Sequence, residues 1–90
     1  MTRYSIFVSG RVQGVGFRFF VQQQVVHYSL TGWVRNLYDG RVAMEVQGNL
    51  YDIQLFITKL YEGTRFINVD YLEKSEMPTN ESEVRFQVLY

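Results

Sequence analysis

The chain contains no cysteine and only one histidine. Without cysteine it forms no disulfide, no thiolate zinc site and no cysteine nucleophile. This composition suits a reducing compartment, and we expect a cytoplasmic location. The first residues, Met1-Thr2-Arg3-Tyr4, lack an apolar signal core, and no apolar run approaches the ~18 residues of a membrane span. We therefore expect neither export nor membrane insertion.

An excess of either charge is also absent. Nine Lys and Arg residues balance nine Asp and Glu residues, which gives a formal net charge of zero at pH 7. A protein whose main partner is a nucleic-acid backbone normally carries a basic surplus, so any affinity for anions must come from a local site. The length predicts one domain, residues 1–90, and an aromatic content of 17% supplies apolar area to a small core.

The most informative part of the chain is a glycine-rich stretch, Ser9–Phe20. Apolar residues recur with period two before it and at helical spacing after it, so the stretch joins a strand to a helix. Gly10, Gly14 and Gly16 permit positive φ and a close approach of the backbone to a bound group. Unpaired amides and the dipole at a helix N-terminus favour an anion, and Arg18 adds a two-pronged cationic donor. The stretch therefore predicts a site for a phosphate or a carboxylate.

Two common nucleotide-binding motifs do not fit this stretch. The P-loop requires Gly, four residues and then Gly-Lys-Ser/Thr, whereas Val15 stands five places after Gly10 and the stretch has no lysine. The dinucleotide fingerprint requires a third glycine at the position where Phe19 stands. The sequence therefore predicts a phosphate-sized cradle without nucleotide-binding features.

Two segments resemble the signatures of a known family. Gly10–Arg18, with the sequence GRVQGVGFR, is similar to the signature loop of acylphosphatases, and Gly32–Gly40, GWVRNLYDG, is similar to their second signature. Both segments are long and occur in the family's order and spacing, and the resemblance spans nearly the whole chain. It implies a metal-free and cofactor-free enzyme that hydrolyses acyl phosphates as a monomer, with no nucleic-acid or membrane partner.

The order of the expected elements predicts an α+β, ferredoxin-like fold. Strands are expected over residues 3–9, 31–38, 42–47, 66–74 and 84–89, with helices over residues 17–29 and between Asn49 and Gly63. This order is the split βαβ plan, with two helices on one face of an antiparallel sheet of four to five strands. Asp39-Gly40 indicates a two-residue hairpin turn of type I′ between the second and third strands.

The resemblance also implies roles for individual residues. Arg18 and Asn36 are the implied catalytic residues: Arg18 holds the phosphoryl group, and Asn36 orients the attacking water. The implied backbone cradle consists of Gln13, Gly14, Val15, Gly16, Phe17 and Arg18. Such a site is chemically coherent, because a carboxylate leaving group is a weak base and charge stabilisation can replace acid–base chemistry. An asparagine amide both accepts and donates hydrogen bonds, so it can orient water without deprotonating it.

Two other functions fit the same pattern of elements. An RNA-recognition module has this order, but its third strand carries aromatic residues that stack on bases, and residues 41–48 contain none here. A catalytically idle domain that binds an anion in the same loop stays open. The presence of both Arg18 and Asn36 favours turnover over idle binding.

Two positions depart from the usual pattern of the family. Thr64 stands where proline is usual after the second helix, and Tyr28-Ser29 stands where Leu-Gly is usual before the second strand. Neither position lies in the cradle. Because proline acts mainly by restricting the unfolded chain, the sequence alone predicts that Thr64→Pro is neutral or mildly stabilising.

Overall fold

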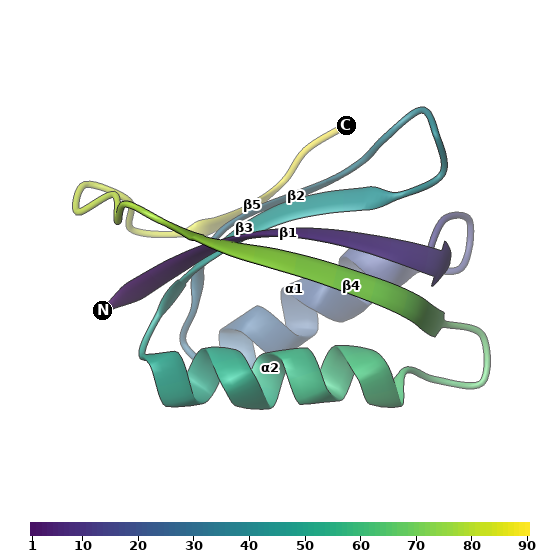
Figure 1. Cartoon of the computed structure of the whole chain (residues 1–90), viewed down its shortest axis with the longest axis horizontal. Helices are drawn as coiled ribbons and strands as arrows, with labels where there is room; N and C mark the ends of the chain where they lie inside the picture. Colours follow the sequence, from purple (N-terminus) through teal and green to yellow (C-terminus); the bar gives the residue numbers. More distant parts are fainter.

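A five-stranded sheet and two helices make up the computed structural model, which describes all 90 residues. Its elements are β1 (Thr2–Arg11), α1 (Phe17–His27), β2 (Thr31–Asn36), β3 (Val42–Gly48), α2 (Leu50–Glu62), β4 (Asn68–Met77) and β5 (Phe86–Val88). The strands lie in the order β4-β1-β3-β2-β5, and both helices cover the same face of the sheet (Figure 1). This arrangement confirms the predicted α+β, ferredoxin-like plan.

The sheet is mixed, so the prediction of a wholly antiparallel sheet is wrong. The pairs β1–β3, β1–β4 and β2–β3 are antiparallel, but β5 pairs with β2 in parallel. The reason is the direction of the chain at the two edges. β4 runs opposite to β2, and the chain reverses after β4 when it crosses to the far edge of the sheet, so β5 has to run in the direction of β2.

The core fills the space between the sheet and the two helices. Ile6 and Val8 on β1 alternate with more exposed neighbours, as the period-two pattern predicts. Further core residues are Val42, Met44 and Val46 on β3, Phe17, Val21 and Val25 on α1, Ile53, Phe56 and Leu60 on α2, and Val69 on β4. The side chain of Asn49 caps α2 by accepting a hydrogen bond from the amide of Tyr51 at 2.9 Å, and Gly63 ends the helix, as predicted. No helix is long and apolar enough to cross a membrane.

The turn between β2 and β3 differs from the predicted type I′ turn. The amide of Leu37 donates to the carbonyl of Arg41 at 2.8 Å, so three residues separate the paired positions. Type I′ needs positive φ at both central residues, and in this turn only Gly40 has it, at 95°. Asp39 instead accepts hydrogen bonds from the backbone and the side chain of Arg41. β2 therefore ends at Asn36, two residues earlier than predicted.

A buried polar cluster ties the connection between β4 and β5 to the sheet. Arg3 is only 4% exposed, and its guanidinium lies 2.8 Å from a carboxylate oxygen of Glu45 and 2.8 Å from one of Glu83. The buried side chain of Gln47 accepts from the amide of Asn80 at 2.7 Å and donates to its carbonyl at 2.9 Å. Because Asn80 and Glu83 belong to the connection, these bonds hold the segment that leads into β5.

The cluster makes stability depend on pH in a defined direction. Burial raises the pKa of the Glu83 carboxyl, but hydrogen bonds from Arg3 and Thr31 and the charge of Arg3 outweigh it, so the folded-state pKa lies below its usual value. A lowered folded-state pKa stabilises the fold above the unfolded-state pKa, about 4.3 for Glu, and this contribution disappears as the pH falls through the folded-state pKa. Glu83→Gln should therefore be less stable than the wild type at pH 7, and the gap should shrink towards pH 3. Urea unfolding at both pH values measures it, and a gap that is constant with pH would contradict the argument.

The helix α1 ends earlier than predicted, at His27, because Ser29 adopts the left-handed conformation with φ 57°. The amide of Leu30 donates to the carbonyl of Val25 at 2.8 Å, and the amide of Ser29 donates to that of Val26 at 3.3 Å. These bonds form a Schellman motif, in which this position is normally glycine.

Glycine at position 29 should therefore stabilise the fold. The left-handed conformation destabilises the fold by about 1–2 kcal/mol when the residue is not glycine. Glycine removes this strain, but it also makes the unfolded chain more flexible, which cancels part of the gain. We expect Ser29→Gly to raise the free energy of unfolding by about 0.5–1 kcal/mol in a urea melt. Ser29→Ala is the matched control, because alanine keeps the strain. Equal stabilisation by both substitutions would show that strain at residue 29 is not the cause.

The contacts of Thr64 reverse the effect that the sequence alone predicts for Thr64→Pro. The amide of Thr64 donates to the carbonyl of Ile67 at 3.1 Å, and its hydroxyl accepts from the amides of Phe66 and Ile67, each at 3.1 Å. Proline removes all of these bonds, which outweighs its restriction of the unfolded chain. We expect a net loss of about 1 kcal/mol in a urea melt. Thr64→Ser keeps the amide and the hydroxyl and should stay within about 0.5 kcal/mol of the wild type; a Pro variant as stable as this control would contradict the expectation.

Candidate functional site

The loop between β1 and α1 has backbone amides without hydrogen-bond partners in the protein. Gly14 and Gly16 have φ of 74° and 80°, which other residues adopt only under strain. No backbone amide from Gln13 through Phe19 donates a hydrogen bond within the protein. A run of amides without partners, in a loop that enters a helix, is a concave donor surface for an anion.

The N-terminus of α1 adds to the positive potential of this loop. Gly16 is its N-cap, no side chain caps the helix, and its first turn contains no acidic residue. The free amides and the positive end of the helix dipole therefore have no negative partner within the protein. Phe17 is buried in the core and fixes the start of the helix beneath the loop. This end of α1 therefore has free donors that an anion could occupy in place of a capping side chain.

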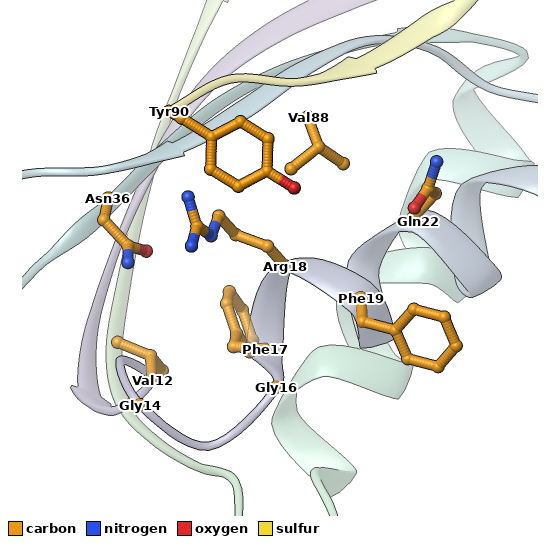
Figure 2. A pocket seen from close by; sticks show the side chains of 10 residues that line it. All are labelled: Val12, Gly14, Gly16, Phe17, Arg18, Phe19, Gln22, Asn36, Val88 and Tyr90. Carbon is orange, nitrogen blue, oxygen red and sulfur yellow. The ribbon is translucent and has the colours of Figure 1, made fainter.

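Arg18 projects from the first turn of α1 beneath the C-terminal segment. Its Nη1 donates to the carbonyl of Leu89 at 3.1 Å, and the guanidinium carbon lies 4.7 Å from the centre of the Tyr90 ring. No other hydrogen bond of Arg18 is formed, so most of its N–H groups are available to a ligand. In Figure 2 the guanidinium lies between the Tyr90 ring and the amide of Asn36. The two residues after β5 thus orient the arginine that the sequence analysis selected.

Asn36 is the last residue of β2, and the strand register brings it to the loop. It pairs with Val42 on β3, and Val42 pairs with Val8 near the end of β1. Its amide oxygen Oδ1 is buried and accepts no hydrogen bond. A buried acceptor without a partner costs about 1–3 kcal/mol, so such a group in a native site points to a ligand that completes it.

Gln13 has a second role that the sequence analysis missed. Its side-chain nitrogen Nε2 donates to the carbonyls of Leu37 and Arg41, each at 2.8 Å. These carbonyls belong to the turn that follows Asn36. The side chain therefore ties this turn to the glycine-rich loop, and it fixes the position of Asn36 relative to the amides of the loop.

A pocket of about 270 Å³ joins these features. Of the residues selected from the sequence, Gly14, Gly16, Phe17, Arg18 and Asn36 line it, whereas Gln13 and Val15 do not. The sequence analysis missed its other lining residues, which are Val12, Phe19, Gln22, Val88 and Tyr90. Phe19 carried a usable signal as an apolar residue beside Arg18 on the exposed side of the helix. No three His, Cys, Asp or Glu side chains lie together in an arrangement that could hold a metal ion.

Comparisons with known proteins give a consistent result. The sequence profile of the acylphosphatase family matches residues 4–88. An acylphosphatase of Geobacillus kaustophilus is 44% identical over 90 residues, which cover 100% of this chain and 96% of that protein. The crystal structure of acylphosphatase from Bacillus subtilis superposes with a TM-score of 0.93 at 40% identity, and each chain is covered completely. The fold also matches 12% of the much longer HypF of T. kodakarensis, with a TM-score of 0.87 at 36% identity.

Proposed function

The chain belongs to the acylphosphatase family, and from this premise we propose that it hydrolyses acyl phosphates by a mechanism in which the loop amides and Arg18 hold the phosphoryl group and Asn36 orients the attacking water. The overall reaction converts an acyl phosphate dianion and water into a carboxylate and dihydrogen phosphate. The family assignment replaces the alternative of an RNA-recognition module. We further propose that residues 1–90 act as one domain and as a monomer.

The phosphoryl group fits the donors at the N-terminus of α1. The amides between Gln13 and Phe19 have no partner within the protein, and the helix dipole and Arg18 add positive charge. In phosphoryl transfer the negative charge spreads over the equatorial oxygens of a loose transition state. Donors fixed in advance around those oxygens stabilise this charge without reorganisation, which is a large contribution to catalysis.

The observation that carries the proposal is the buried and unpartnered Oδ1 of Asn36. A water placed at the pocket between Asn36 and the phosphoryl group would donate to this oxygen. The amide of asparagine does not take up a proton, so it holds the water in position without deprotonating it. Gln13 acts on this step as a positioning residue, because its side chain bonds the turn after Asn36 to the loop.

The chemistry needs no protein acid or base. The oxygen of water forms a bond to phosphorus while the bond from phosphorus to the acyl oxygen breaks, and the electron pair of that bond leaves with the carboxylate. A carboxylate is a weak base and departs without protonation. The proton released by the water goes to the phosphate oxygens of the substrate itself. Positioning and charge stabilisation are then the main contributions of the protein.

The direct test is the hydrolysis of benzoyl phosphate by the purified protein in excess EDTA. We expect turnover that the chelator does not reduce and that inorganic phosphate inhibits competitively, because product and substrate share the cradle. Binding of phosphate without turnover would refute the proposal and leave an idle anion-binding domain.

A further inference from the structure

The pocket is larger than a phosphoryl group requires. Its volume of about 270 Å³ approaches the ~300 Å³ at which pockets for small organic ligands begin. The loop glycines, Arg18 and Asn36 line one end of it. Phe19 and Gln22 line the other end, one helical turn apart on α1, and Val88 of β5 also lines the pocket (Figure 2). The pocket therefore has room beside the phosphoryl group for a second part of the ligand.

The geometry of the reaction indicates where the second part of the ligand, the acyl group, lies. The attacking and leaving oxygens of a transferred phosphoryl group are roughly in line through phosphorus. If Asn36 holds the water, the acyl group departs on the side away from Asn36. In Figure 2, Asn36 lies at one end of the lining residues, Arg18 lies in the middle, and Phe19 and Gln22 lie at the opposite end.

We propose that the groove between α1 and β5 is the subsite for the acyl group, with Phe19 and Val88 against its apolar part and the amide of Gln22 as a hydrogen-bond donor to its carbonyl oxygen. This inference rests on the proposed function of the same site. Phe19 is 64% exposed, so most of its side chain is available to a ligand. An acyl group in this groove covers part of a large apolar side chain that the fold itself leaves in water.

The charges of the groove define the class of acyl group. Arg18 has the only charged side chain that lines the pocket, and in the proposed mechanism the phosphoryl group occupies it. An acyl group with its own carboxylate or phosphate therefore finds no second cation. The subsite favours uncharged, apolar acyl groups, and an aromatic acyl group such as benzoyl covers more of Phe19 than an acetyl group does.

A second recess on the other side of Asn36 is the competing location. Arg35, Leu37 and Tyr38 line it together with Asn36 and Tyr90, and the Tyr38 side chain is fully exposed. An acyl group there would lie on the same side of the phosphoryl group as the water that Asn36 holds, which in-line transfer does not permit. Tyr38 is therefore a matched control for Phe19, since both are exposed aromatic residues that flank the site.

The test compares kcat/KM for benzoyl phosphate with kcat/KM for acetyl phosphate in four proteins: the wild type, Phe19→Ala, Phe19→Leu and Tyr38→Ala. The intrinsic reactivity of each substrate cancels when the ratios of the proteins are compared. We expect Phe19→Ala to lower the benzoyl-to-acetyl ratio by about three- to tenfold, less than the ~10- to 200-fold of an enclosed pocket, because the ring is partly exposed. Phe19→Leu should restore part of the ratio, and Tyr38→Ala should leave it within about twofold. Alanine is a better helix former than phenylalanine, so α1 should persist.

The outcomes separate this inference from the function on which it rests. If the wild type hydrolyses both substrates and only Tyr38→Ala changes the ratio, the acyl group lies in the other recess and the proposal is overturned. An unchanged ratio in both variants overturns it as well, since neither ring then contacts the acyl group. Hydrolysis of neither substrate by the wild type would instead overturn the proposed function.

Discussion

Replacement of Arg18 by alanine should lower kcat/KM for benzoyl phosphate by more than a thousandfold. Loss of one neutral oxyanion donor typically removes about 2.7–4 kcal/mol of transition-state stabilisation. Arg18 supplies a full charge and a planar fork of donors as well, and all but one of these donors are unused within the protein. The measurement is steady-state hydrolysis, together with the inhibition constant of phosphate, which should rise because the product binds in the same cradle.

Two further variants define what Arg18 contributes. Arg18→Lys keeps the charge but not the fork, so we expect activity between that of the wild type and that of the alanine variant. Arg35→Ala removes an exposed arginine that lies on β2 next to Asn36 but does not line the pocket that contains Arg18, and it should change kcat/KM by less than about threefold. An equal loss of kcat/KM in Arg18→Ala and Arg35→Ala would mean that Arg18 acts through the local electrostatic potential and not through direct contact with the substrate.

The sequence was sufficient for those parts of the site that lie close together along the chain. The alternation before Gly10 and the helical spacing after Phe17 place a strand-to-helix loop, and the glycines between them indicate the left-handed turns that the structure contains. Local backbone preference and side-chain periodicity determine these features, and both can be read from a single segment. The cradle and the start of α1 follow from them.

The parts that could not be predicted depend on contacts between distant segments. Residues 86–88 form a strand of only three residues, whose pattern specifies neither its partner nor its direction. Its pairing with β2 follows from the crossing of the sheet after β4, and only that pairing brings Leu89 and Tyr90 to Arg18. The bonds of the Gln13 side chain to the turn after Asn36 span more than twenty residues and leave no local pattern.

Replacement of Asn36 by alanine should separate catalysis from binding. We expect kcat for benzoyl phosphate to fall by about a hundred- to a thousandfold, because a water that is no longer oriented rarely adopts the in-line position. The inhibition constant of phosphate should stay within about threefold, since Arg18 and the loop amides remain. Weaker phosphate binding with an unchanged kcat would show that Asn36 contacts the anion instead of the water.

The stability of Asn36→Ala is an independent test of the role of Asn36. A residue retained for structure should destabilise the fold when it is truncated, but Oδ1 of Asn36 forms no hydrogen bond within the protein, so its removal breaks none. The cost is then limited to the packing lost on truncation, so the urea midpoint should stay close to that of the wild type while turnover falls. Asn36→Asp has the same shape and places a carboxylate beside the phosphoryl group, so it should weaken phosphate binding by repulsion. If the site keeps this acceptor for the water of the reaction, two results are expected together. Asn36→Ala should lose activity and retain stability, and Asn36→Asp should lose affinity for phosphate.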